Sequence, residues 1–264
     1  MKFSQITQTA VDAALLAGEI IRKGFGTSYE ISLKPGIQNF VTPYDHAAEE
    51  AILSTIKMHF PDHGFLCEES GASANQDAEI VWLIDPLDGT ANFYHRVPIF
   101  AVSIGAVSPE KGVVSGVIYQ PMTHELFVAE KGLGAYFNHK PMRVSSTKEI
   151  SGGIVATGFP RNVAQNPQNC IDHFIHILKR DTVIRNLGSS AINIAYVAAG
   201  RYDAYWAVSL HPWDIAAAVL LVEEAGGKIS SFNGNPYDIL SSTPLAASNG
   251  VLHEELISIL RGNN

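Results

Sequence analysis

Short apolar segments, separated by proline and glycine turns, occupy the chain from Glu79 to about Val144. The four clearest are IVWLI, FAVSIGAV, GVVSGVIY and ELFVAE. Short strands with turn signals between them are typical of antiparallel sheets, so this series constrains the fold more than any other part of the sequence. We therefore expect a largely antiparallel sheet in the first half of the chain.

Two helical patterns precede this series. The first covers residues 4 to about 23, where apolar side chains recur near helical spacing before Gly24. The second is predicted to start at Thr42 and to end near residue 60, because Thr42, Pro43 and Asp45 resemble a capping box. The segment FLCEES that follows is expected to contain the end of a strand.

The second half of the chain alternates strand-like and helical segments. IVATGF and TVIRNL are strand-like, and helical patterns cover residues 169–179, 189–199, 214–225 and 251–260. No internal repeat or long linker separates the halves, so a seam near 145–152 divides subdomains at most. We predict one layered α/β (α+β) domain over 1–264, with subdomains of about 1–148 and 149–264.

Composition and charge exclude several classes of protein. The 264 residues are 46% hydrophobic, yet no stretch approaches the roughly 20 apolar residues of a membrane helix, and the N-terminus lacks the apolar run of a secretory signal. The net charge of −8 argues against direct nucleic-acid binding. Cys67 and Cys170 form no CxxC pair, which favours reduced thiols and a cytoplasmic location.

Oxygen ligands gather where the apolar strand VWLI runs into DPLDGT at 85–90. Pro86 is expected to end regular pairing and Gly89 to permit a tight turn, which would throw Asp85, Asp88 and the Leu87 carbonyl to one side. Mg²⁺ takes such oxygens together with waters and a phosphate oxygen. The N–H groups of a short helix opening at Gly89 would hold the phosphate. An ordinary turn is the alternative.

Two further acidic segments favour the metal site. Asp214 follows Trp213 and precedes a strong helical pattern, where it is either an N-cap worth about 1 kcal/mol, a ligand at the helix N-terminus, or both. In CEES, strand alternation points only one of Glu68 and Glu69 inward, and the sequence does not distinguish them.

Four motifs resemble those of the inositol monophosphatase family. They are DPLDGTANF at 85–93, PWDIAAAVLLVEEAGG at 212–227, EES at 68–70 and VTPYD at 41–45, in the family's order and across nearly the whole chain. The resemblance implies a layered α-β-α-β-α sandwich of the inositol monophosphatase and fructose-1,6-bisphosphatase type. It also implies a homodimeric, lithium-sensitive, Mg²⁺-dependent phosphatase that acts on a small phosphorylated metabolite.

The resemblance also implies a set of metal ligands. Glu69, Asp85 and the Leu87 carbonyl correspond to ligands of the first metal, and Asp85, Asp88 and Asp214 to those of a second. A third, looser ion is typical near Glu69, which gives two or three Mg²⁺ per subunit. Two metals about 3.5–4 Å apart can activate water and hold the phosphoryl oxygens during an in-line displacement.

By the same resemblance, Thr90, supported by Asp45, orients or helps to deprotonate the attacking water together with Glu69. The capping-box interpretation of Asp45 stays open beside this role. The residues that the resemblance places against the substrate are Leu87, Asp88, Gly89, Thr90, Ser190 and Asp214.

One position departs from the family's pattern. Members that process inositol phosphates commonly carry a glutamate seven residues before the WD aspartate, where it binds sugar hydroxyls, and this chain has Ala207 there. Our first hypothesis is an inositol-1-phosphate phosphatase of broad tolerance. The alternatives are a phosphatase for fructose bisphosphate, histidinol phosphate, 3′-phosphoadenosine phosphate or NADP, and a regulatory binding protein with vestigial activity.

Overall fold

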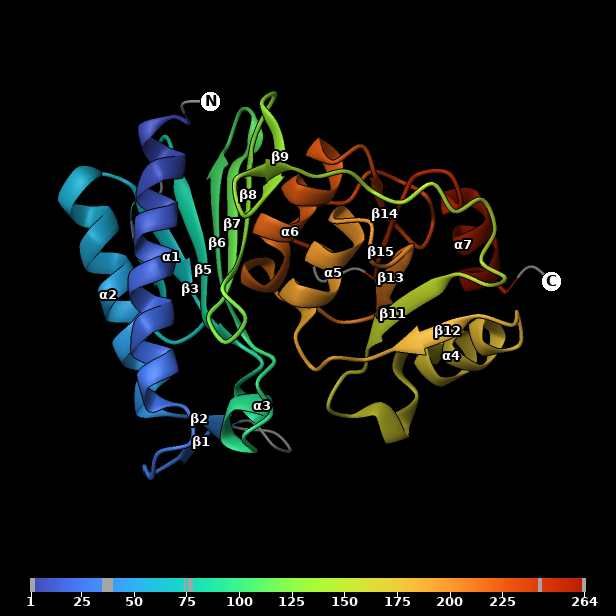
Figure 1. Cartoon of the computed structure of the whole chain (residues 1–264), viewed down its shortest axis with the longest axis horizontal. Helices are drawn as coiled ribbons and strands as arrows, with labels where there is room; N and C mark the ends of the chain where they lie inside the picture. Colours follow the sequence, from blue (N-terminus) through green and yellow to red (C-terminus); the bar gives the residue numbers. More distant parts are fainter. Residues whose placement is uncertain (1–2, 35–39, 74, 76–77, 242–243, 263–264) are drawn as a thin grey trace.

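The computed structural model describes residues 3–34, 40–73, 75, 78–241 and 244–262. Helices and sheets alternate in five layers, from α1 and α2 on one side to α4 and α7 on the other (Figure 1). This confirms the expected α-β-α-β-α sandwich. Each layer buries its apolar side chains against the next, so the core is divided into three clusters between the layers.

The first layer is a helix pair, α1 (Gln5–Gly24) and α2 (Pro43–His59). The Ser4 side chain caps α1 by accepting a hydrogen bond from the Thr7 N–H, and Thr42 caps α2 in a complete capping box with Asp45. Both predicted helices are therefore confirmed within one or two residues of their expected ends. The helices pack through alanine and isoleucine side chains onto one face of the larger sheet.

The larger sheet has eight strands in the order β10-β9-β8-β7-β6-β5-β3-β4. Every neighbouring pair is antiparallel except β3 with β5, which confirms the predicted sheet. Its strands are β3 (Gly64–Cys67), β4 (Gly71–Ser73), β5 (Val81–Asp88), β6 (Ala101–Ser108), β7 (Gly112–Gln120), β8 (Glu125–Glu130), β9 (Gly134–Phe137) and β10 (Lys140–Pro141).

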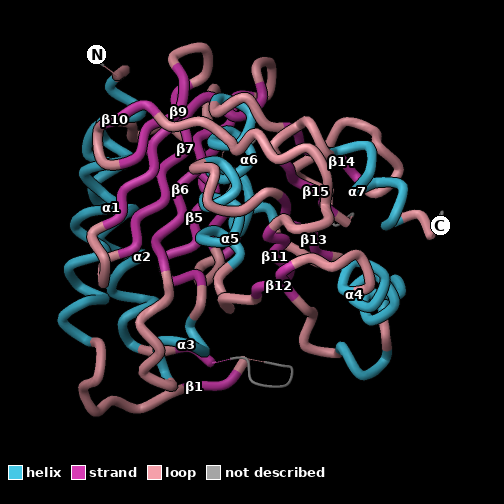
Figure 2. Tube along the Cα trace, turned by 45° about the vertical axis from the view of Figure 1, so that its right-hand side comes forward, coloured by secondary structure: helices cyan, strands magenta, loops and turns pink. Residues whose placement is uncertain are grey.

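The middle layer consists of α5 (Ser190–Ala198) and α6 (Pro212–Glu224), which lie between the two sheets (Figure 2). Helix α6 approaches the larger sheet at two glycines. A Cβ added to Gly105 would lie 2.7 Å from the Ala216 Cβ, and one added to Gly116 would lie 2.6 Å from the Ala217 carbonyl oxygen. The small residues on both partners thus bring the N-terminus of α6 close to the central strands.

The smaller sheet has five strands in the order β12-β11-β13-β15-β14. Strands β11 (Ile154–Gly158) and β12 (Val183–Arg185) were both expected, whereas β13 (Ala204–Ala207), β14 (Lys228–Ser231) and β15 (Leu245–Ser248) were not. The outer helices α4 (Cys170–Leu178) and α7 (His253–Leu260) cover its far face. The chain passes from one sheet to the other between residues 141 and 154.

The remaining elements are short. Strands β1 (Ser32–Leu33) and β2 (Phe40–Val41) pair with each other, α3 (Thr90–Tyr94) follows β5, and two 3₁₀ turns (Val163–Gln165 and Pro167–Asn169) precede α4. Among the described residues, no helix is both long enough and apolar enough to cross a membrane.

Candidate active site

Strand β5 presents the DPLD segment at the centre of the larger sheet. Asp85 pairs with Ser103 and Asp88 with Ala101, and the register shifts between them, so the strand bulges at Pro86, which has no N–H to donate. The sequence predicts that pairing ends at Pro86. In the structure, pairing instead resumes after Pro86, at Asp88. Gly89 then adopts φ 101°, a left-handed conformation that favours glycine, and α3 begins at the next residue.

Most of the predicted site residues meet at one cavity of about 660 Å³. Those on its wall are Asp85, Leu87, Asp88, Gly89, Thr90, Ser190 and Asp214. The cavity lies where the end of β5 meets the N-termini of α5 and α6. Helix N-termini carry unpaired N–H groups and partial positive charge, so this place suits an anion as well as the cations that carboxylates bind.

Protein donors fix the orientation of each aspartate. The Leu87 N–H donates to Asp85 Oδ1 at 2.9 Å. Asp88 Oδ2 accepts from the Ser189 hydroxyl at 2.5 Å and from the Ala191 N–H at 2.6 Å, which ties it to the start of α5. These contacts hold the carboxylates in place without neutralising their charge.

Asp214 is the third residue of α6 and not its N-cap. The helix begins at Pro212, with His211 as N-cap, and Asp214 Oδ2 accepts the His211 N–H at 2.8 Å. Proline is well suited to the first turn because its missing N–H has no helical partner there, so the helix starts two residues earlier than predicted. The Asp214 carboxylate still lines the cavity, as the ligand interpretation requires.

The carboxylates of Asp85, Asp88 and Asp214 are buried and repel one another. Burial raises the pKa of Asp85 and of Asp214 well above the usual range, and the negative charges of neighbouring carboxylates raise both further. Burial also raises the pKa of Asp88 to about 6. Within the described part of the chain none of the three forms an ion pair, so the protein itself supplies no countercharge in contact with them.

This donor set fits Mg²⁺. Carboxylate and carbonyl oxygens are its preferred protein ligands, and uncompensated buried carboxylates are what a divalent cation would neutralise. No three His, Cys, Asp or Glu side chains of the described residues form a ready-made cage around one point. Mg²⁺ does not require one, because it keeps several waters and binds substrate phosphate oxygens.

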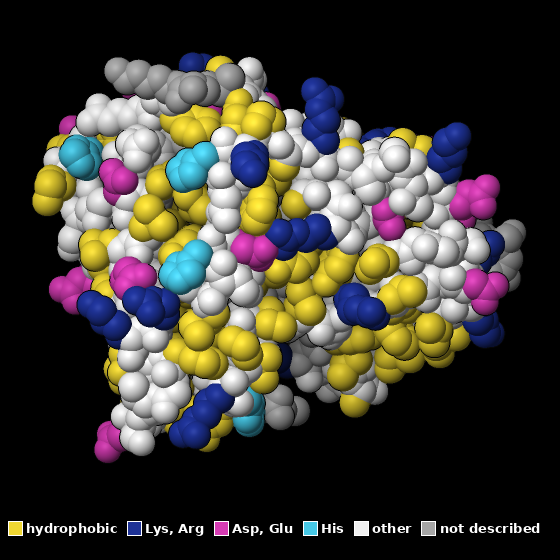
Figure 3. Space-filling model, in the orientation of Figure 1, with side chains coloured by type: hydrophobic (Ala, Val, Ile, Leu, Met, Phe, Trp, Pro, Cys, Tyr) yellow, Lys and Arg dark blue, Asp and Glu magenta, His cyan; other side chains and the backbone are white. Residues whose placement is uncertain are grey.

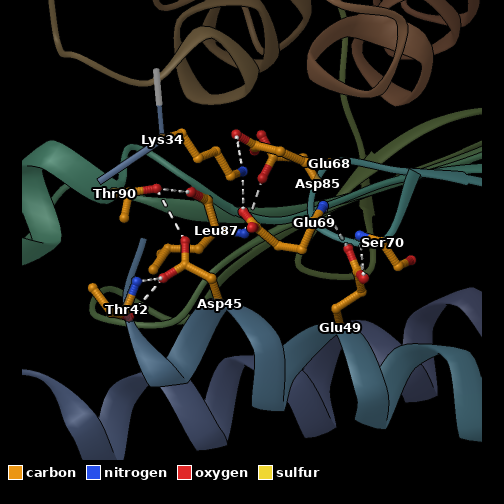
Figure 4. A network of polar contacts seen from close by, with 10 residues as sticks. All are labelled: Lys34, Thr42, Asp45, Glu49, Glu68, Glu69, Ser70, Asp85, Leu87 and Thr90. Atoms are coloured by element: carbon orange, nitrogen blue, oxygen red, sulfur yellow. Dashed lines mark hydrogen bonds and ion pairs between the residues drawn. The ribbon is translucent and has the colours of Figure 1, made fainter. Parts of the chain in front are cut away.

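The two neighbouring glutamates share one partner but differ in burial (Figure 4). Lys34 Nζ lies 3.5 Å from Glu68 Oε1 and 2.7 Å from Glu69 Oε1. Glu68 lines the cavity, and its charge is among those that raise the pKa values of Asp85, Asp88 and Asp214. The Glu69 side chain is only 2% exposed, and its Oε1 accepts a hydrogen bond from Lys34 Nζ at 2.7 Å. Its Oε2 is buried with no hydrogen-bond partner among the described residues.

Glu68 lines the cavity and Glu69 does not, whereas the resemblance implied Glu69 as the metal ligand. Strand β3 ends at Cys67, so the alternation of a strand no longer governs the residues that follow. The buried Glu49 carboxylate fixes this turn by accepting the Glu69 N–H at 3.0 Å and the Ser70 N–H at 2.9 Å. Glu49 projects from α2, in a part of the sequence that carries no catalytic motif (Figure 4).

Asp45 makes the contacts of a capping box and also contacts Thr90. Its Oδ2 accepts from the Thr42 N–H at 2.8 Å and from the Thr42 hydroxyl at 2.5 Å, as in a capping box. The Thr90 hydroxyl lies 3.1 Å from Asp45 Oδ1 and 3.0 Å from the Leu87 carbonyl oxygen. Burial raises the pKa of Asp45 to about 6, and the negative charge of Glu69 contributes to the rise. Asp45 is thus linked to the cavity through Thr90.

The cavity wall also includes residues that the sequence analysis left without a role. Lys34, Arg161, Asn193 and His211 all line it. Arg161 follows the predicted strand IVATGF closely, and a cation just beyond a strand end could have been noticed as a candidate. Ala207, at the position of the family's glutamate, is only 1% exposed and belongs to the core beneath the cavity.

Comparisons with known proteins agree with this geometry. The sequence model of the inositol monophosphatase family matches residues 2–264. An inositol-1-monophosphatase of Caulobacter vibrioides is 36% identical over 253 residues, which cover 95% of this chain and 99% of that protein. The Nus factor SuhB of Escherichia coli is 41% identical over 252 residues, covering 95% and 94%.

A solved structure extends the likeness to three dimensions. The extragenic suppressor protein suhB of Bartonella henselae superposes with a TM-score of 0.93 at 36% identity, over 99% of this chain and 100% of that chain. The family model, the curated relatives and the solved structure all span nearly the whole sequence. This chain therefore belongs to the inositol monophosphatase family and is a phosphatase.

Proposed function

We propose that this phosphatase hydrolyses inositol 1-phosphate or a related phosphate monoester, with Mg²⁺ held in the cavity at the end of β5. One observation carries the proposal: Asp85, Asp88 and Asp214 line the same cavity without an ion pair among the described residues. Three such carboxylates are unfavourable unless they are protonated or bound to cations. A substrate phosphate is also anionic, so its binding would increase the need for bound cations.

Glu68, Asp85, Asp88, Asp214 and the Leu87 carbonyl would hold the metal. Bound Mg²⁺ would supply positive charge to the phosphoryl oxygens and lower the pKa of the attacking water. We infer that Glu68 takes the ligand position that the resemblance gave to Glu69, because Glu68 lines the cavity. Four carboxylates around one phosphate favour more than one divalent cation, in keeping with two or three Mg²⁺ per subunit.

The chain's own residues would position the attacking water. The Thr90 hydroxyl has a single proton, which it can share with Asp45 Oδ1 and the Leu87 carbonyl. Its oxygen is then free to accept a hydrogen bond from the water. A carboxyl with a pKa of about 6, such as Asp45, can exchange a proton through Thr90 near neutral pH. The negative charge of Glu69 raises the pKa of Asp45 further and so favours its protonated form.

The substrate test is phosphate release with and without Mg²⁺ across inositol 1-phosphate, fructose 1,6-bisphosphate, histidinol phosphate, 3′-phosphoadenosine phosphate and NADP. We expect Mg²⁺-dependent release, with inositol 1-phosphate among the accepted substrates. Preference for another compound would replace the substrate and keep the mechanism. No release from any of them would contradict the proposal and favour the regulatory role suggested by the name of the Escherichia coli relative.

We also propose a homodimer. Hydrophobic side chains gather over α4 on the face shown in Figure 3. Ile175 and Leu178, which lie one turn apart on α4, are 40% and 51% exposed, and Val183 of β12 is 41% exposed. Light scattering on the purified protein should give twice the monomer mass of 28.5 kDa. A monomer at micromolar concentration would contradict this.

The free, buried cysteines agree with the cytoplasmic location proposed from the sequence.

A further inference from the structure

The cavity that holds the aspartates also has a positively charged side chain on its wall. Arg161 lies three residues beyond the end of β11, and Gly158, the last residue of that strand, pairs with Ala207 of β13. Arg161 therefore follows the same end of the smaller sheet as Ala207, and it brings a positive charge to that end.

The guanidinium of Arg161 is available to a ligand. Its side chain is exposed, and it forms no hydrogen bond or ion pair with any residue that the structure describes. Its charge lowers the pKa of Asp214 against the larger rise caused by burial, so it lies within electrostatic reach of the catalytic end of the cavity. A guanidinium offers five donors in a planar fork that matches phosphate oxygens.

A neutral acceptor lies on the same cavity wall. Asn193 projects from α5 and is only 1% exposed, yet it lines the cavity. Its Oδ1 is buried without a hydrogen-bond partner in the described part of the chain. Buried polar atoms are nearly always paired, so an unpaired one at a cavity wall indicates a ligand or a water. A substrate hydroxyl could donate to this atom without the repulsion that a carboxylate would exert on an anion.

We propose that Arg161 and Asn193 select the alcohol portion of the substrate, and that the preferred substrate is a polyol bisphosphate. The phosphate to be released would lie at the aspartates, the second phosphate against Arg161, and a hydroxyl between them on Asn193. This inference rests on the proposed function and narrows its substrate class. Arg161 and Asn193 are specificity-determining residues in this scheme and take no part in the bond cleavage.

The test compares fructose 1,6-bisphosphate with fructose 1-phosphate, which differ only in the second phosphate. A charge-assisted contact of this kind is worth about tenfold in affinity or more. We expect kcat/KM of the wild-type protein to favour the bisphosphate by about that factor. Arg161→Gln should remove the preference by raising KM for the bisphosphate, and Arg161→Lys should retain part of it. Arg22→Gln, on the outer face of α1, serves as the matched control and should leave the preference intact.

The outcomes separate the two proposals. An equal loss on both substrates in Arg161→Gln, or an unchanged preference, would overturn the role of Arg161 while phosphatase activity itself stood. Absence of Mg²⁺-dependent release from either substrate by the wild-type protein would overturn the proposed function and this inference with it. Asn193→Leu, which keeps the volume and removes the acceptor, should lower kcat/KM about fivefold or more on both substrates. A folded variant with unchanged kcat/KM would overturn the role of Asn193.

Discussion

Glu49 and Asp85 are both buried carboxylates near the same turn, and they differ in what surrounds them. Glu49 accepts two backbone N–H groups from one turn and lies outside the cavity. Asp85 accepts one, lies on the cavity wall, and is surrounded by the charges of Glu68, Asp88 and Asp214. A carboxylate satisfied by the backbone fixes the structure, whereas three aspartates that face one cavity without an ion pair among the described residues require a cation.

Removing the charge of one of the cavity aspartates should have the largest effect on turnover. Asp88→Asn and Asp214→Asn change neither size nor shape, yet each deletes a proposed metal ligand. We expect turnover at saturating Mg²⁺ to fall by about 100-fold or more, since even outer-shell changes around a metal cost 10–100-fold. Phosphate release and circular dichroism would be measured together. A folded variant with the wild-type rate would show that these aspartates are not ligands.

The two neighbouring glutamates offer a matched pair. Because Glu68 lines the cavity and Glu69 does not, Glu68→Gln should reduce turnover by about tenfold or more and raise the Mg²⁺ concentration for half-maximal activity. Glu69→Gln should have the smaller effect on both quantities. The reverse order would restore Glu69 as the ligand and show that the turn rearranges when the metal binds.

Glu49 should affect activity only by positioning the turn that carries Glu68 and Glu69. Glu49→Gln keeps the size of the side chain but leaves it with a single acceptor oxygen for the two N–H groups of the turn. We expect a severalfold rise in the Mg²⁺ concentration for half-maximal activity, about tenfold at most. Glu50→Gln, the exposed neighbour on α2, is the control. Equal behaviour of the two variants would mean that Glu49 does not position the turn.

The last prediction concerns a different quantity, the stability of the protein without metal. Asp45 and Asp88 have pKa values of about 6 in the folded protein, above the 3.8 that is usual for the side chain. The folded state therefore binds more protons than the unfolded state between these values, and the free energy of unfolding should fall as pH rises through about 6. The loss is on the order of 2–3 kcal/mol per group.

Denaturant titrations at pH 4 to 7 in EDTA would reveal this slope. Mg²⁺ should reduce it, because a bound cation favours the ionised carboxylates and binds only the folded site. An unfolding free energy that rises with pH in EDTA would contradict the assignment of these carboxyls as destabilised by burial.

The sequence was informative where one short segment determines its own structure. Capping boxes, glycine turns and apolar runs placed α1, α2 and the strands of the larger sheet, and DPLDGT placed its own carboxylates. Strands β13 to β15 were missed because AYWA, KISS and LAAS are four residues each, and their pairing depends on the surrounding sheet more than on their own residues.

The site was predictable only in part for a related reason. The aspartates lie in motifs, but the choice between Glu68 and Glu69 depends on where β3 ends and on Glu49, which lies well before them in the chain on α2. Arg161 and Asn193 reach the cavity from separate elements of the second half. Their proximity depends on the fold, so no local sequence pattern predicts it.

The most direct test of the central claim is phosphate release from inositol 1-phosphate by the wild-type protein as Mg²⁺ is removed with EDTA and then restored. We expect release to stop in EDTA and to return with Mg²⁺, because the carboxylates of the cavity act only through a bound cation. Release that continues unchanged in EDTA would contradict that claim.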